Sequence, residues 1–138
     1  MRLVFPHKLE DPVEIERIEN AGGRVVFYPS TDMVPRLNGN LAVARAIGDA
    51  DEVGLECIPD YQFEAISDSK KSFLVIACDG LWDVALPQNC MNVLNCFYND
   101  LKGFEAKAAK SLTSYAYGNY STDNISVIVV DLSPELPN

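Results

Sequence analysis

Two aspartates stand beside the two most apolar stretches of the sequence. Asp79 follows the run Phe73–Cys78, and Asp123 comes shortly before the run Ile125–Val130. If these runs are strands that pair antiparallel, the end of the first lies beside the start of the second, so both carboxylates reach the same edge of a sheet. Two carboxylates brought together in a half-buried place repel one another unless a proton or a cation bridges them. Because oxygen ligands favour Mg²⁺ or Mn²⁺ over zinc, the pattern indicates a divalent-cation site.

A glycine and a third carboxylate follow Asp79 in the string ACDGLWD. Gly80 permits a tight turn after the strand, and Asp83 can then return to the same edge as a further ligand. An Asp-Gly pair is also common in ordinary turns, and an aspartate before a strand is often only a cap. On the residue pattern alone, the metal site and the simple turn remain alternatives.

Two helices are expected between the strands that carry these aspartates. Pro87 opens the first, and the second covers residues 104–117, with Gly118 as its stop. The apolar face of the first helix has the helical spacing i, i+3, i+4, i+7 and consists of Cys90, Val93, Leu94 and Phe97. A strand, two helices and a second strand therefore form the C-terminal part of the chain.

The N-terminal part of the sequence begins with a capped helix. Asp11 is placed to cap it, Pro12 fits its first position, and Glu14 would complete a capping box while belonging to a solvated acidic face. After the Gly22-Gly23 stop, residues 24–28 are expected to form a strand.

The middle of the sequence is less decisive. Residues 41–51 suit a strand or a helical turn, and residues 55–67 suggest a strand that Pro59 interrupts. No repeat or linker is present, so the whole chain, 1–138, is expected to form a single domain.

Charge excludes two classes of partner. The formal net charge is −9, which opposes binding to nucleic acid and to anionic membranes. The longest apolar runs are far shorter than the ~20 residues of a membrane helix. We therefore expect neither a nucleic-acid nor a membrane partner.

The N-terminus and the cysteines indicate a reducing compartment. The start, MRLVFPHK, lacks the apolar region of a secretion signal, so a cytoplasmic or nuclear location is expected. The four cysteines form no C-x-x-C pair, which favours buried free thiols over disulfides or zinc ligands.

Three motifs taken in order are more specific than either strand. LNGNLAVARAIGDAD, FLVIACDGLWDV and STDNISVIVVDL together resemble the C-terminal part of the metal-dependent type 2C Ser/Thr protein phosphatases, the PPM family, and HKLEDPVEIERIENAGG is similar to a further segment of that family. The resemblance covers essentially the whole chain. It implies an α+β fold, an α-β-β-α sandwich of antiparallel sheets flanked by helices, of which only the C-terminal part is present.

The resemblance also implies roles for the aspartates. Asp79 and Asp123 would be ligands of a binuclear Mn²⁺ or Mg²⁺ centre, and Asp83 would serve a third, weaker metal. In the complete domain, a metal-bridged water would attack the phosphorus of phosphoserine or phosphothreonine in a phosphoprotein substrate. The reaction needs no phosphoenzyme.

Supporting roles follow from the resemblance and from residue type. Asn124 would hold the Asp123 loop, and Arg45 with Asp49 would support the core or a flap beside the site. Trp82 is expected to be a packing anchor, because large aromatic residues after a strand usually fill the core. Cys78 is expected to be buried and inert, since a neighbouring carboxylate raises the pKa of a thiol.

The sequence departs from the family in two ways. Pro6 stands where the family usually has an aspartate before His-Lys, which weakens the third metal site, and the family's N-terminal half, with its own metal-binding motif, is absent. Either the chain is part of a longer phosphatase, inactive alone, or it is a shortened relative that serves as a non-catalytic pseudophosphatase or protein-binding module. Its partner would be the missing half or, through uncovered strands, a second copy of the chain.

Overall fold

A computed structural model describes residues 3–28, 34–66, 72–97 and 104–132, with the side chains of residues 104 and 105 left out. The chain divides into two compact units, Arg2–Phe63 and Glu64–Asn138, called here the N-terminal and C-terminal units. Their union in one domain stays a prediction. Among the helices in the described ranges, none has the length and apolar character needed to cross a membrane.

The N-terminal unit begins with the predicted helix. Helix α1 spans Pro12–Asn20, and the Asp11 side chain caps it by accepting a hydrogen bond of 2.9 Å from the Val13 amide. The predicted strand is shorter than expected, because only β1, Val25–Val26, pairs antiparallel with β2, Arg36–Leu37. The fold of this unit therefore depends on contacts other than a long strand ladder.

Glu14 makes several of those contacts, and the capping-box and solvated-surface role predicted for it was wrong. It is 2% exposed and forms neither a capping box nor part of a solvated face. Arg17 donates from Nε to Glu14 Oε2 over 2.9 Å, and Arg45 donates to Glu14 Oε1 from Nε and Nη2. Burial alone would raise the pKa of Glu14, but these hydrogen bonds and the two guanidinium charges hold the pKa below its usual value.

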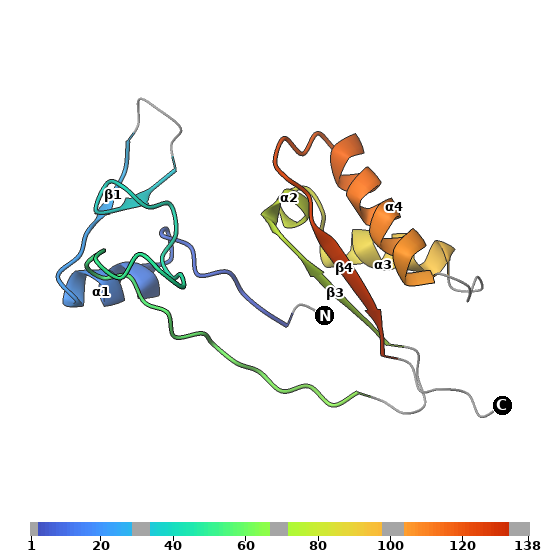
Figure 1. The fold of residues 1–138 in the computed structure, drawn as a ribbon, viewed down its shortest axis with the longest axis horizontal. Helices are drawn as coiled ribbons and strands as arrows, with labels where there is room; N and C mark the ends of the chain where they lie inside the picture. Colours follow the sequence, from blue (N-terminus) through green and yellow to red (C-terminus); the bar gives the residue numbers. More distant parts are fainter. Residues whose placement is uncertain (1–2, 29–33, 67–71, 98–103, 133–138) are drawn as a thin grey trace. The chain divides into compact units, whose positions relative to one another are not determined.

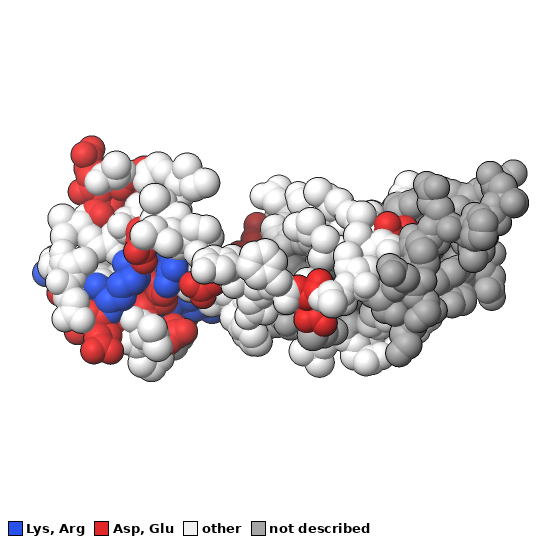
Figure 2. Space-filling model, turned by 90° about the horizontal axis from the view of Figure 1, so that it is seen from below, with Lys and Arg blue, Asp and Glu red and all other residues white. Residues whose placement is uncertain are grey.

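Residues 41–51 form neither the predicted strand nor the predicted helical turn. The strand predicted for residues 55–67 is absent from the described residues 55–66, and residue 67 lies outside the described ranges. The segment after β2 contains two isolated bridges, Leu37 with Leu41 and Arg45 with Glu56. Arginine side chains instead bind its main-chain carbonyls: Arg17 donates to Ala44 O and Gly54 O over 2.9 and 2.8 Å, and Arg45 donates to Ile58 O over 2.8 Å. Figure 2 shows basic atoms in a band flanked by acidic ones on this unit.

The C-terminal unit is a two-stranded sheet with helices on one face (Figure 1). Strand β3, Phe73–Ala77, pairs antiparallel with β4, Val127–Asp131. The connecting helices are α2, Asp79–Trp82, α3, Pro87–Cys96, and α4, Phe104–Gly118. Both long helices and both strands were predicted. The mixture of helices and antiparallel sheet expected from the resemblance is confirmed.

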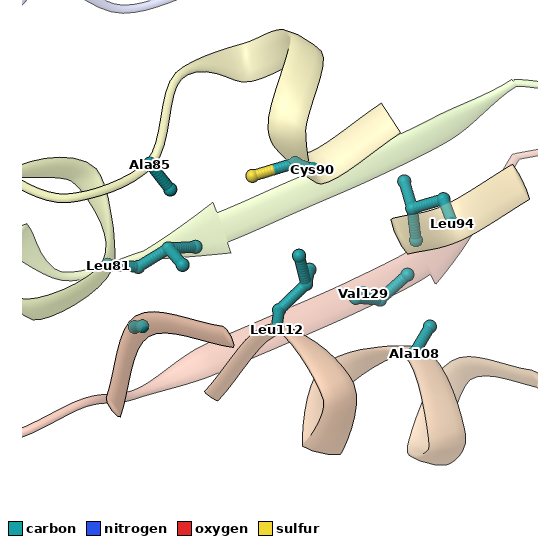
Figure 3. Packing of buried hydrophobic residues seen from close by; sticks show 8 residues of the cluster. Leu81, Ala85, Cys90, Leu94, Ala108, Leu112 and Val129 are labelled. Carbon is teal, nitrogen blue, oxygen red and sulfur yellow. The ribbon is translucent and has the colours of Figure 1, made fainter. Parts of the chain in front are cut away.

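The helices and one face of the sheet enclose the apolar core of this unit (Figure 3). Its buried residues are Leu81, Ala85, Cys90, Leu94, Ala108, Leu112, Ala116 and Val129. Burial raises the pKa of the Cys90 thiol. All four cysteines are free as predicted, but Cys57 and Cys96 are exposed and Cys78 is half-buried, so the expectation of buried thiols holds only for Cys90.

The opposite face of the sheet is also apolar. In the antiparallel register Leu74 lies opposite Val130 and Ile76 opposite Ile128, and alternation places these four residues away from the core. Ile76 is 52% exposed and Ile128 is 58% exposed. Apolar side chains exposed together on a sheet favour association.

Dimerisation of the isolated chain therefore stays a prediction with a defined surface. Light scattering at increasing concentration is expected to show a dimer that Ile128→Lys converts to a monomer, because the lysine places a charge in the centre of the apolar face. Val13→Lys, at an exposed position of α1, is the control and should leave the dimer intact. A wild-type monomer at every concentration would contradict the prediction.

Candidate metal centre

The sheet register brings the two predicted metal-binding segments to one edge. Ala77, the last residue of β3, pairs with Val127, the first residue of β4, and the Cys78 amide donates to Ser126 O over 3.2 Å. Asp79 directly follows Cys78, and Asp123 lies shortly before Ser126, in the loop that leads into β4. The antiparallel arrangement inferred from the sequence is therefore present.

Asp79 opens a helix instead of a tight turn. Helix α2 begins at Asp79, and the Asp83 amide donates to Asp79 O over 2.9 Å. Because residues four apart lie on the same face of a helix, Asp79 and Asp83 can point to the same side. The indole Nε1 of Trp82 donates to Ala77 O over 2.9 Å, and the ring packs on the core as predicted.

The three predicted ligands line one pocket of about 120 Å³. Its walls are Asp79, Gly80, Asp83, Val84, Tyr120, Ser121, Thr122 and Asp123. The three carboxylates are exposed to solvent, whereas the sequence predicted a half-buried place for them. Apart from main-chain groups, the polar atoms of these lining residues are carboxylate and hydroxyl oxygens, a donor set that fits Mg²⁺ or Mn²⁺ better than zinc.

Two of the carboxylates are held by their own neighbours. Asp79 Oδ1 accepts from the Gly80 amide over 3.1 Å, and Asp123 Oδ1 accepts from the Asn124 amide over 2.7 Å. Within the described part of the chain, the second oxygen of each has no hydrogen-bond partner. Each aspartate therefore presents one oriented carboxylate oxygen for an external ligand.

Gly80 has a different role from the predicted one. Its backbone is not in the left-handed region, so the turn does not require its conformational freedom. A Cβ at this position would lie 2.2 Å from the carbonyl oxygen of Asn124. Only glycine therefore lets the start of α2 approach the Asp123 loop so closely.

The described residues do not contain a complete metal-binding group. Within the described ranges, no set of three or more histidine, cysteine, aspartate or glutamate side chains is grouped closely enough to hold a metal ion. The metal roles of Asp79, Asp83 and Asp123 therefore stay predictions.

Of the residues predicted to support the site, Asn124 acts through its backbone, while Arg45 and Asp49 belong to the N-terminal unit. Asn124 contributes its amide to Asp123 and its carbonyl to Cys78, whose thiol donates over 3.1 Å. Arg45 binds Glu14 and Ile58 O within the N-terminal unit, while Asp49 is an exposed residue with a φ of 49°. The flap-supporting role of Arg45 and Asp49 stays a prediction.

Four residues that line the pocket were not predicted as part of the site: Val84, Tyr120, Ser121 and Thr122. Ser121 donates from Oγ to Gly80 O over 2.7 Å, and Tyr120, 90% exposed, lies in the left-handed region with a φ of 64°. The hydroxyl of Ser121 left no local signal, because its partner is 41 positions away. The left-handed conformation of Tyr120 could not be predicted, because glycine and asparagine, not tyrosine, usually adopt it.

Known proteins are similar to this chain in sequence. A family model described as Protein phosphatase 2C matches residues 1–125. "Probable protein phosphatase 2C 68" of Oryza sativa subsp. japonica is 40% identical over 96% of this chain and 36% of its own length. "Protein phosphatase 2C homolog 1" of Saccharomyces cerevisiae is 36% identical over 96% of this chain and 43% of its own length.

Solved structures also match this chain in fold. A phosphatase from Toxoplasma gondii has a TM-score of 0.76 and 34% identity, covering 94% of this chain and 41% of that one. A Caenorhabditis elegans sex determining protein has a TM-score of 0.81 and 28% identity, covering 96% of this chain and 32% of that one. The chain thus spans about two fifths or less of these relatives' lengths. Because the family model covers most of its residues, the chain belongs to the protein phosphatase 2C family.

Proposed function

We propose that this chain carries one part of the metal-binding site of a Mn²⁺- or Mg²⁺-dependent phosphatase that acts on phosphoserine and phosphothreonine in proteins. The observation that carries the proposal is the pocket shared by Asp79, Asp83 and Asp123 at the edge of the sheet. Membership of the protein phosphatase 2C family supports the substrate class.

The oriented carboxylates suit this role. Asp79 and Asp123 would hold the cations through the oxygens that have no hydrogen-bond partner among the described residues. Asp83, four residues after Asp79, would add a ligand for a further cation. Bound divalent cations would supply charge neutralisation at the phosphoryl group and a more acidic water for attack in line with the leaving oxygen.

This chain alone is expected to be inactive, because its carboxylates do not make a complete group within the described residues. The missing ligands would come from a further part of the phosphatase domain, as the coverage of the relatives suggests. A polypeptide with that part is therefore the expected partner.

Complementation tests the proposal. Hydrolysis of p-nitrophenyl phosphate with Mn²⁺ should be absent for the chain alone and should appear when the N-terminal half of a relative's catalytic domain is added. Asp79→Asn is expected to remove at least about 90% of that activity, since changing even an outer-shell partner of a metal ligand typically costs about 10–100-fold in metal affinity or activity.

The control is Glu64→Gln, which removes one charge from an exposed position of the same unit outside the pocket. Activity equal to that of the unchanged chain is expected. Full activity of Asp79→Asn in the complemented mixture would overturn the proposed metal site.

A further inference from the structure

The segments that carry Asp79 and Asp123 are joined beyond the end of the sheet by contacts that have no part in the strand ladder. The Cys78 thiol donates to Asn124 O over 3.1 Å and accepts from the Ser126 amide over 3.2 Å. The Ser121 hydroxyl donates to Gly80 O over 2.7 Å. We call these three hydrogen bonds the clasp.

The clasp encloses both aspartates in sequence. Cys78 and Gly80 stand on either side of Asp79, while Ser121 and Asn124 stand on either side of the Thr122-Asp123 pair. The contacts therefore join the main chain next to one carboxylate to the main chain next to the other. The start of α2 and the Asp123 loop are each held at two points. Neither segment can therefore rotate about a single contact.

Other contacts hold the Asp123 loop at its two ends, where the Ser121 amide donates to Ala116 O over 3.1 Å and Ile125 packs on the core. Thr122, Asp123 and Asn124 are all exposed, so burial of their side chains does not fix the loop. The Asn124 amide bonds within the loop itself, to Asp123 Oδ1. Across the described residues, the side chains of Cys78 and Ser121 form the hydrogen bonds that fasten this loop to the start of α2.

We infer that Cys78 and Ser121 are positioning residues that set the separation of the Asp79 and Asp123 carboxylates, and so set the affinity of the proposed site for divalent cations. The inference rests on the proposed function for its metal-binding consequence, but the clasp itself is independent of it. A thiol and a hydroxyl both donate and accept, so serine should replace Cys78, whereas alanine should not.

The first test measures the clasp without any metal. Amide hydrogen exchange in the wild-type chain is compared with that in Cys78→Ala, Ser121→Ala and Cys78→Ser. Exchange of the Ser126 amide should become about three- to tenfold faster in Cys78→Ala, the effect of losing one ordinary hydrogen bond, with the Val129 amide in β4 unchanged. Cys78→Ser should restore the wild-type rate at Ser126.

The matched control is Cys96→Ala. Cys96 is an exposed cysteine whose thiol bonds to Asn92 O in its own helix α3, away from the pocket. It should leave exchange at residues 121–126 unchanged. Wild-type exchange rates in both Cys78→Ala and Ser121→Ala would overturn the clasp.

The second test uses Mn²⁺ alone as the probe. Paramagnetic broadening of the Asp79 and Asp123 amide signals should reach its midpoint at about three- to tenfold higher Mn²⁺ in Cys78→Ala and Ser121→Ala, and at the wild-type concentration in Cys78→Ser. Faster exchange without a changed midpoint would overturn the positioning role.

The two proposals fail in different ways. Absence of broadening at Asp79 and Asp123 in the wild type would contradict the proposed metal site and, with it, the claim about metal affinity, while hydrogen exchange would still decide whether the clasp exists. If Mn²⁺ broadens the wild-type signals and all four variants reach the midpoint at the same Mn²⁺ concentration as the wild type, the metal site would stand. The positioning role would then be refuted.

Discussion

Replacing Gly80 with alanine is expected to lower the free energy of unfolding of the C-terminal unit by about 3 kcal/mol, the upper part of the range for overpacking. The added Cβ would lie 2.2 Å from the Asn124 carbonyl oxygen. That oxygen belongs to the backbone and accepts a hydrogen bond from the Cys78 thiol, so it cannot move aside without breaking the clasp. Relief requires the start of α2 to separate from the Asp123 loop.

Chemical unfolding followed by tryptophan fluorescence measures this effect in the correct unit, because Trp82 is the single tryptophan of the chain. Gly118→Ala is the control. Its Cβ would meet nothing within 4 Å, and alanine at a helical position should raise stability by up to about 1 kcal/mol. Gly80→Ala as stable as Gly118→Ala would show that the start of α2 and the Asp123 loop are not packed as described.

Replacing Glu14 with glutamine is expected to destabilise the N-terminal unit by about 2–3 kcal/mol. Breaking a fully buried ion pair costs about 3–5 kcal/mol. The expected loss is smaller than for a fully buried pair because the side chains of Arg17 and Arg45 are 23% and 18% exposed. Water therefore partly solvates the two arginines after the Glu14 charge is lost. Hydrogen exchange at the Ile18 amide, within α1, reports this loss.

The same substitution should change the acid response. Since the pKa of Glu14 in the folded chain is lowered, its stabilising contribution is present above the ordinary pKa of about 4.5 and is lost as the pH falls through the lowered value. Protection at Ile18 should fall in that acidic range in the wild type and should fall less in Glu14→Gln. Glu16→Gln, on the exposed side of the same helix, should behave as the wild type. An equal acid response in all three proteins would contradict the ion-pair account.

Local patterns predicted the parts of the fold that local interactions determine. The cap at Asp11, the proline at the start of α3 and the apolar runs of β3 and β4 each act within a few residues, and each element was found. The shared edge of the two strands was predicted only on the condition that they pair antiparallel, because a connection through helices also permits parallel pairing. The observed register is antiparallel.

Residues with distant partners were missed. Glu14 looked like one of several helix-surface acids because the arginine that buries it, Arg45, lies 31 positions away. Gly80 was taken for a turn residue because the carbonyl it must approach belongs to Asn124, on the far side of two helices in sequence. Such contacts depend on packing between elements, which no periodicity records.

The arginines that bind the main chain of residues 44–58 decide which substitutions this region tolerates. Arg17 and Arg45 contact carbonyl oxygens, which every amino acid carries, so the identities of Ala44, Gly54 and Ile58 are not read by these bonds. Each arginine uses several donors of its planar fork at once, a geometry that lysine lacks. An exposed residue such as Ile58 can therefore vary without loss of these bonds, whereas burial constrains Ala44 and a φ of 84° constrains Gly54. Lysine in place of either arginine would lose several bonds at once.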